Sequence, residues 1–273
     1  MKSKLLLRCI INYFVIVLFF FLTSCHKKNT NSIIVYGSVK DIDGNTYKTI
    51  KIGSQIWMAE NLRTTRYQNG DTIPYISSNT IWASQLKGAQ CCYNNTSNSD
   101  SILKLGRLYN NYALNDFRGI APLGWRAPND KDWVKLKEFI ELSHLPGEAL
   151  SSPVGWTNNK GNNPYNMYND TLRSFFGNTY DIYDIYGFTS LPNGSRQSSD
   201  GSFNDIGFEA CFWSSTYKPN GTGSVVSISG DTRKRKGRVR YELSYNDFDW
   251  WLRSTGCSVR CIKGAEVKYI DYD

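Results

Sequence analysis

The sequence is poor in the side chain that enzymes use most often to move protons, because its 273 residues include only two histidines, His26 and His144. Histidine is the commonest general acid or base in catalysis. The chain also lacks the His-Glu-x-x-His, Gly-x-Ser-x-Gly and phosphate-loop motifs, which position metal ligands, nucleophiles and phosphates. We therefore expect that the protein is not an enzyme and that it carries no cofactor.

Long apolar runs are also scarce. The run from Ile10 to Phe21 spans about a dozen residues, whereas a helix needs about 20 to cross a bilayer. Cations precede this run and Leu22-Thr23-Ser24-Cys25 follows it, which is typical of a signal peptide. The small residues before Cys25 resemble a bacterial lipobox, which implies cleavage before Cys25 and a diacylglycerol on its thiol. The alternatives are an uncleaved signal anchor or an ordinary signal peptide.

No internal repeat and no linker rich in proline or serine divides the rest of the chain. We expect a lipoprotein signal peptide at 1–24, a lipidated polar linker at 25–35, one large domain at 36–264 and a C-terminal tail at 265–273. Lipid alone would then hold the protein to a membrane. The expected location is the cell envelope, at the outer membrane, with the surface or periplasmic face left open and the oligomeric state not indicated.

Much of the positive charge is concentrated in one run. The net charge is +8, of which three cations belong to the signal peptide. Six cations lie close together further along the chain, namely Arg233, Lys234, Arg235, Lys236, Arg238 and Arg240. We interpret this run as a candidate patch for anionic ligands such as lipopolysaccharide or acidic glycans, and the alternative is a solvated hairpin tip. No nucleic-acid partner is expected for an exported chain.

Seven cysteines are present, and five remain once Cys9 and Cys25 are set aside: Cys91, Cys92, Cys211, Cys257 and Cys261. All five are disulfide candidates in an exported protein. Cys257 and Cys261 are expected to share a strand, where four residues span about 13 Å, and a disulfide tolerates only about 7 Å between Cα atoms. The two should therefore not pair with each other, and the choice among the other partners stays open. Their spacings fit no zinc pattern, so no metal site is expected.

Turn and cap signals locate two local structures. Residues 35–52 alternate in polarity around Asp43-Gly44, which predicts a β-hairpin. Pro128 and Asn129 form a helix start, and the following apolar side chains repeat at helical spacing. We expect Trp133, Leu136 and Ile140 on the buried side of that helix.

Aromatic and β-branched residues predict two late strands, at residues 212–216 and 258–262. Trp213 and Val259 are expected to pack in the core rather than to bind a ligand.

Several separate motifs resemble, in order, those of the Fibrobacter succinogenes major paralogous domain family, FISUMP. They are residues 41–62, Gly106-Arg-Leu-Tyr-Asn110, Gly124-Trp-Arg-Ala-Pro-Asn-Asp-Lys-Asp-Trp133, Gly187-Phe188, Leu191-Pro-Asn-Gly194, Phe212-Trp-Ser-Ser-Thr216 and Ser258-Val-Arg-Cys261. The resemblance runs from about residue 36 to residue 264, and it is specific because many motifs keep their order.

The resemblance has implications for the fold. FISUMP is similar to the formylglycine-generating and C-type-lectin-like group, which implies an α+β fold with a twisted antiparallel sheet, few helices and long loops. Fold similarity alone does not transfer function. Family members often carry cysteine where Ala121 stands, so the usual disulfide of the family is not expected here.

A stretch from Trp156 to Tyr186 is rich in tyrosine, asparagine and aspartate. Aromatic faces together with amide and carboxylate groups are typical of sugar sites, and the alternative is a polar loop that closes on itself. The candidate ligand-binding residues are Trp156, Tyr165, Tyr168, Tyr180, Asp181, Tyr183 and Asp184. We therefore expect a non-catalytic envelope lipoprotein that binds an external or cell-wall ligand such as carbohydrate. The alternatives are a structural or assembly protein of the envelope and a degenerate formylglycine-generating-like enzyme.

Overall fold

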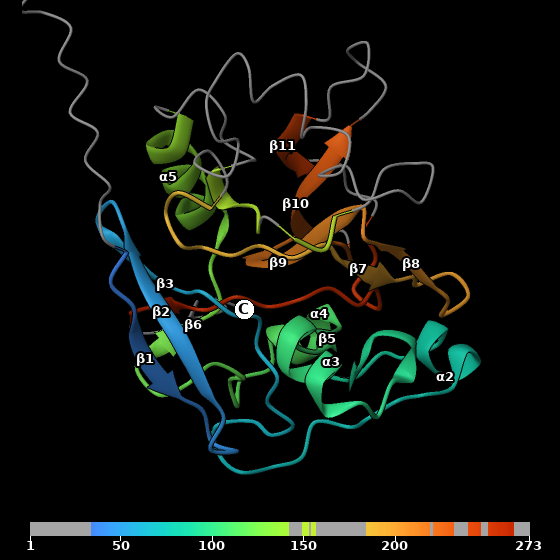
Figure 1. Cartoon of the computed structure of the whole chain (residues 1–273). Helices are drawn as coiled ribbons and strands as arrows, with labels where there is room; N and C mark the ends of the chain where they lie inside the picture. Colours follow the sequence, from blue (N-terminus) through green and yellow to red (C-terminus); the bar gives the residue numbers. More distant parts are fainter. Residues whose placement is uncertain are drawn as a thin grey trace, which may run out of the picture. The chain divides into compact units, whose positions relative to one another are not determined.

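The computed structural model describes residues 34–141, 149–152, 154–156, 184–218, 221–231, 240–246 and 251–264. These residues belong to one compact unit that spans 34–273. They form an α+β fold in which short helices surround two five-stranded sheets and one two-stranded sheet (Figure 1). Within these residues no helix is both long and apolar enough to cross a membrane.

The first sheet has the strand order β1-β2-β3-β12-β6 and the second has the order β11-β10-β9-β7-β8. The strands are β1 Gly37–Lys40, β2 Thr46–Ile52, β3 Gln55–Met58, β4 Gln90–Cys91, β5 Leu108–Tyr109, β6 Trp125–Arg126, β7 Asn193–Arg196, β8 Phe203–Ile206, β9 Glu209–Tyr217, β10 Gly223–Asp231, β11 Arg240–Asn246 and β12 Ile262–Lys263. The helices are α2 Asn79–Ala83, η1 Tyr93–Asn95, α3 Ser99–Leu105, α4 Asn111–Leu114 and α5 Asp130–Ile140.

The hairpin predicted at residues 35–52 is confirmed as β1 and β2, which pair antiparallel from Gly37↔Thr49 to Lys40↔Thr46. Gly44 adopts φ +84° in its turn, a conformation that favours glycine because it has no Cβ. The Asp41 carboxylate accepts the Asn45 backbone N–H at 2.9 Å. Short-range turn chemistry thus fixes the start of the fold.

The helix predicted after Pro128 is confirmed as α5. Asn129 is its N-cap and forms a capping box with Asp132, so two of the backbone N–H groups at the helix start are satisfied. Trp133, Leu136 and Ile140 are fully buried, as their spacing predicted. This helix packs its apolar side into the core that lies against the second sheet.

Strand β9 is buried on both faces. Ala210 and Phe212 contribute to the core cluster that contains α5, whereas Cys211 and Trp213 contribute to a second cluster that contains α4 residues. Successive side chains of a strand point to opposite faces, so the second sheet lies between two apolar layers. Figure 1 accordingly shows α5 on one side of β9 and α4 on the other. The core position predicted for Trp213 is confirmed, since it is 0% exposed.

The strand predicted at residues 258–262 forms only in its last part, β12. The preceding residues change partner at almost every step: Cys257 pairs with Tyr109, Ser258 with Phe212, and the Val259 carbonyl accepts the Leu62 N–H at 2.8 Å. A segment whose hydrogen bonds go to several elements cannot form one regular ladder. Residues 257–263 therefore run between the two sheets and tie them together, with Val259 fully buried as predicted.

Buried tyrosines are expected to make this fold sensitive to alkali. The Tyr47 side chain is 0% exposed. Its hydroxyl donates a hydrogen bond to Asp41 Oδ2 at 2.5 Å and accepts one from the Arg63 backbone N–H at 3.0 Å. Burial, and after it the hydrogen bond to Asp41, holds the pKa of Tyr47 far above its ordinary value. Burial likewise raises the pKa of Tyr109 well above that value. Tyrosines in the unfolded chain ionise near pH 10. The stabilisation that the buried, neutral tyrosines provide is therefore fully present below about pH 10 and is lost as the pH rises further.

We expect the free energy of unfolding, measured with urea between pH 8 and pH 11, to fall steeply above about pH 10. The Tyr47→Phe variant should be less stable at pH 8, because Asp41 and the Arg63 N–H lose a buried partner. Its stability should nevertheless fall less steeply with pH than that of the wild type. Equal slopes in the two proteins would contradict the assignment to Tyr47.

Candidate functional site

The stretch from Trp156 to Tyr186, called here the candidate ligand loop, has described residues at both ends. Trp156 is 1% exposed and lies in the cluster that contains Trp133 and Phe188. Its ring is therefore used in packing and presents no free face. At the other end, the Asp184 carboxylate accepts the Thr189 backbone N–H at 2.5 Å and the Thr189 hydroxyl at 2.7 Å. Of the predicted ligand-binding residues, five lie outside the described residues, namely Tyr165, Tyr168, Tyr180, Asp181 and Tyr183.

Asp184 starts a tight turn that leads into the core. Asp184, Gly187 and Thr189 all have positive φ, at 48°, 71° and 56°, and the Gly187 N–H donates to the Asp184 carbonyl at 2.9 Å. Left-handed conformations cost free energy at non-glycine residues, and the carboxylate bonds to Thr189 offset this cost. Asp184 thus acts as a turn residue in this structure, with both carboxylate oxygens already engaged.

A buried arginine lies beneath this turn. The Arg260 guanidinium donates to Asn61 Oδ1 from Nε at 3.1 Å and from Nη2 at 2.7 Å, and to the carbonyls of Phe188 and Thr189. Its central carbon lies 4.3 Å from the Phe188 ring centroid and 5.3 Å from that of Phe212. A cation gains electrostatic energy over an aromatic face. Arg260 therefore joins β9, the turn after Asp184 and the segment around Asn61.

Burial controls the electrostatics of this corner. Burial raises the pKa of the Asp184 carboxyl, and the Thr189 hydrogen bonds and Arg260 oppose this shift. Burial also lowers the pKa of Arg260, since a charged form loses hydration in the interior. Tyr36 is 39% exposed, and burial again raises its pKa. These groups hold the turn that starts at Asp184 in place.

The predicted anionic-ligand patch falls at the end of a hairpin. Strands β10 and β11 pair antiparallel, and Asp231↔Arg240 is the last pair of their ladder. The residues that join them, including Arg233, Lys234, Arg235, Lys236 and Arg238, lie outside the described residues, and Arg240 is described only as a position in β11. The hairpin register is therefore established, while the binding role of its cations stays a prediction.

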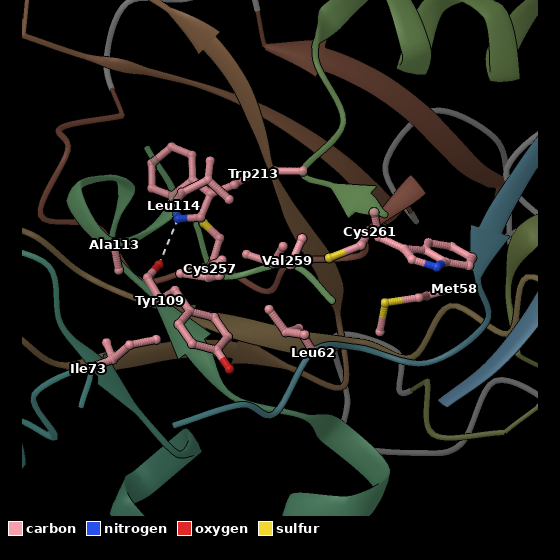
Figure 2. Close-up of a cluster of buried hydrophobic side chains, with 14 of the residues drawn as sticks. Met58, Leu62, Ile73, Tyr109, Ala113, Leu114, Trp213, Cys257, Val259 and Cys261 are labelled. Atoms are coloured by element: carbon pink, nitrogen blue, oxygen red, sulfur yellow. Dashed lines mark hydrogen bonds between the residues drawn. The ribbon is translucent and has the colours of Figure 1, made fainter. Parts of the chain in front are cut away.

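The five cysteine candidates are all buried: Cys91, Cys92, Cys211, Cys257 and Cys261. The structure brings Cys211 and Cys257 together, with 2.6 Å between their sulfur atoms. Cys257 and Cys261 lie on either side of Val259 along one segment (Figure 2). The lipidation candidate Cys25 lies outside the described residues. In the described part of the chain, no three histidine, cysteine or acidic side chains gather as metal ligands would.

Two structural arginines were not predicted from the sequence. Arg196 and Arg260 are 0% and 1% exposed, whereas arginine is almost never fully buried. The Arg196 guanidinium donates to the carbonyls of Gly201, Ile76 and Ser77 and to Asn79 Oδ1. It also lies over the Trp82 and Phe203 rings, at 4.5 and 4.6 Å. Arg260 belongs to the Ser-Val-Arg-Cys motif that the sequence analysis identified, but no sequence periodicity predicts that its side chain is buried.

The two arginines have the same physical role. Each spreads its donors over carbonyl groups of irregular segments, and buried carbonyl groups need hydrogen-bond partners. The segment before α2 and the turn after Asp184 are held to the core in this way, despite little regular structure.

Comparisons with known proteins agree with the motifs. No curated protein and no solved structure matches the chain significantly. The family model described as the Fibrobacter succinogenes major domain matches residues 50–263, which include most of both five-stranded sheets and α5. The chain therefore belongs to the Fibrobacter succinogenes major domain family.

Proposed function

We propose that this protein is a lipid-anchored envelope lipoprotein whose non-catalytic domain binds an external or cell-wall ligand, with carbohydrate as the ligand class. We also propose that its fold is related to the C-type-lectin-like group. The observation that carries the binding proposal is the attachment of the candidate loop: Trp156 packs in the core at one end and Asp184 is hydrogen-bonded at the other. Fixed loop ends reduce the conformational entropy that a ligand must remove on binding.

The composition of the loop supports carbohydrate as the ligand class. Residues 157–183 contain seven asparagines and four tyrosines. Tyrosine rings offer apolar faces to sugar C–H groups, and side-chain amides can both donate and accept hydrogen bonds from hydroxyls. Loops on a rigid scaffold commonly carry binding residues. The proposed site therefore comprises side chains of residues 157–183, which lie between Trp156 and the turn at Asp184 in the sequence.

The proposal is tested by measuring binding of the whole chain, purified in detergent, to a panel of glycans and envelope polymers at low and high salt. Binding to one glycan class that persists at high salt supports recognition through the tyrosine loop. Binding only to anionic polymers, and only at low salt, instead indicates the cations around Arg235, because salt screens exposed charges. A blank panel contradicts the carbohydrate proposal.

The lipid anchor makes a separate prediction. Metabolic labelling with a fatty acid should mark the wild-type protein, and Cys25→Ser should abolish this label because the thiol is the attachment atom. Globomycin, which blocks lipoprotein signal cleavage, should cause the wild-type precursor to accumulate. Cys91→Ser is the matched control and should keep the label, since Cys91 is a buried residue of β4. Unchanged labelling of Cys25→Ser would contradict the anchor.

One observation favours the alternative of a structural or assembly protein. Phe117 and Leu123 are 89% and 90% exposed and lie on the segment between α4 and β6. Contiguous exposed apolar patches are typical of contacts with other proteins, whereas single exposed apolar side chains are common on any surface. If the glycan panel is blank, in vivo crosslinking should yield a defined adduct that Phe117→Ser removes. An adduct unchanged by that substitution would count against assembly through this segment.

A further inference from the structure

Among the described cysteines, Cys211 and Cys257 bring their sulfur atoms to within 2.6 Å of each other. Both side chains are 0% exposed. This separation is too close for two unbonded thiols at rest, whose van der Waals surfaces meet at a much greater distance, and it approaches the roughly 2.0 Å of a disulfide bond. The pair therefore lies where a covalent bond would relieve the contact.

The backbone around both residues is already fixed in the required position. The Ser258 N–H donates to the Cys211 carbonyl at 3.1 Å, and the Trp213 N–H donates to the Ser258 carbonyl at 3.0 Å. On its other side, Cys257 exchanges two hydrogen bonds with Tyr109, at 2.9 and 3.1 Å. Figure 2 shows Cys257 in the same cluster as Tyr109 and Trp213, whose indole N–H donates to the Tyr109 carbonyl. Closing the bond thus requires no change of strand register.

We propose that Cys211 and Cys257 form a disulfide in the mature protein. Each thiol loses one proton, a bond forms between the two Sγ atoms, and two electrons reduce the disulfide of an oxidant such as oxidised glutathione to two thiols. This is ordinary thiol–disulfide exchange. The step belongs to folding, because neither thiol is exposed once the core has closed. Persistence of the bond in the cell rests on the proposed export of the protein.

The other three cysteines are placed as thiols. Cys91 and Cys92 are neighbours in sequence at the end of β4, and Cys92 Sγ accepts a hydrogen bond from Arg107 Nη1 at 3.2 Å. Cys261 lies beyond Val259, beside Met58 (Figure 2). The proposal therefore assigns one disulfide and three thiols to the five described cysteines.

The proposed bond would hold the two sheets together. Cys211 belongs to β9 in the second sheet, while Cys257 starts the segment that ends in β12 in the first sheet. The bond closes a loop between residues 46 positions apart, and that loop contains the β10–β11 hairpin. A crosslink over such a separation restricts the unfolded chain strongly.

The test uses the whole chain, unfolded with reductant and refolded in a buffer of reduced and oxidised glutathione. Free thiols are then alkylated under denaturing conditions, and the protein is digested with trypsin without reduction. Trypsin cleaves after Arg253 and Arg260, so Cys257 and Cys261 fall on different peptides. We expect peptide 254–260 to be joined to the peptide that carries Cys211, with Cys91, Cys92 and Cys261 alkylated. Alkylated Cys211 and Cys257, or a bond from either to another cysteine, would overturn the proposal.

A second measurement remains informative if a variant folds poorly. Wild type refolded in dithiothreitol should have a Tm about 10 °C lower than wild type refolded in the glutathione buffer. Cys261→Ala should show the same loss, whereas Cys211→Ala and Cys257→Ala should show none. A wild-type Tm that does not respond to reductant would overturn the proposal. Refolding is carried out in vitro and does not depend on export or on a ligand. A negative result would therefore contradict the disulfide alone, and not the proposed envelope location or ligand.

Discussion

Replacing Trp133 with alanine is expected to lower the free energy of unfolding by about 3–5 kcal/mol, as for other fully buried aromatic side chains. Trp133 is 0% exposed, and its ring centroid lies 4.8 Å from that of Trp57, 5.7 Å from that of Phe212 and 6.4 Å from that of Phe188. Among the described residues its indole N–H has no hydrogen-bond partner. The expected loss is therefore one of packing and buried area, because no polar contact is removed.

Val134→Ala is the matched control, since Val134 follows Trp133 in α5 but is 42% exposed. Alanine also has a higher helix propensity than valine, so this variant should stay within about 0.5 kcal/mol of the wild type. Urea denaturation followed by tryptophan fluorescence and circular dichroism gives both values. A loss below about 1 kcal/mol for Trp133→Ala would mean that α5 is not packed as the structure shows.

The second large effect is expected at Asn61, because Asn61→Ala removes the side-chain acceptor of a fully buried cation. Arg260 donates twice to Asn61 Oδ1, and Asn61 Nδ2 in turn donates to the Leu105 carbonyl at 2.9 Å and to Ser258 Oγ at 3.3 Å. Losing a hydrogen bond to a buried charged group costs about 1.5–3 kcal/mol. We expect Asn61→Ala to lower the free energy of unfolding by this amount.

A double-mutant cycle separates this explanation from a simple loss of packing. Arg260→Met removes the charge together with its need for acceptors, so Asn61→Ala should cost much less in the Arg260→Met background. Asn204→Ala is the exposed control in β8 and should change stability by less than about 0.5 kcal/mol. Additive costs at Asn61 and Arg260 would contradict the proposed coupling.

The elements that could be predicted from the sequence are those set by local chemistry. The hairpin around Gly44 follows from its turn residues, and α5 follows from the Asn129 cap and the spacing of Trp133, Leu136 and Ile140. Strand β9 could be recognised from its aromatic and small polar residues. In each case the determinants lie within about a dozen residues of one another, so no knowledge of distant contacts is needed.

Features that depend on distant partners could not be predicted. Strands β4, β5, β6 and β12 have two residues each, which is too short for any periodicity. The segment from Cys257 was expected as one strand, but its hydrogen bonds go to four different parts of the chain. The burial of Arg196 and Arg260 likewise depends on carbonyl groups far away in sequence. At the candidate site, sequence could identify the composition of the loop but not the fixing of its ends at Trp156 and Asp184.

The attachment of the candidate loop at Trp156 and Asp184 links the folded core to the proposed binding function. Aromatic packing around Trp133, the Arg260 cation and the proposed Cys211–Cys257 bond all stabilise the elements from which the loop starts and to which it returns. Fixing the ends of a loop removes part of the conformational entropy cost of binding. Variants of Trp133 or Asn61 should therefore weaken any ligand binding only through loss of the folded state.

The most direct test of the account compares glycan binding by three forms of the whole chain on the same panel at high salt. They are the wild type, a variant with Tyr165→Ser, Tyr168→Ser and Tyr180→Ser, and a variant with Arg235→Ser and Lys236→Ser. We predict that the wild type and the cation variant bind one glycan class equally, and that the tyrosine variant loses binding by tenfold or more, equivalent to about 1.4 kcal/mol. Equal binding by the tyrosine variant, or no binding by the wild type, would contradict the proposed carbohydrate-binding function.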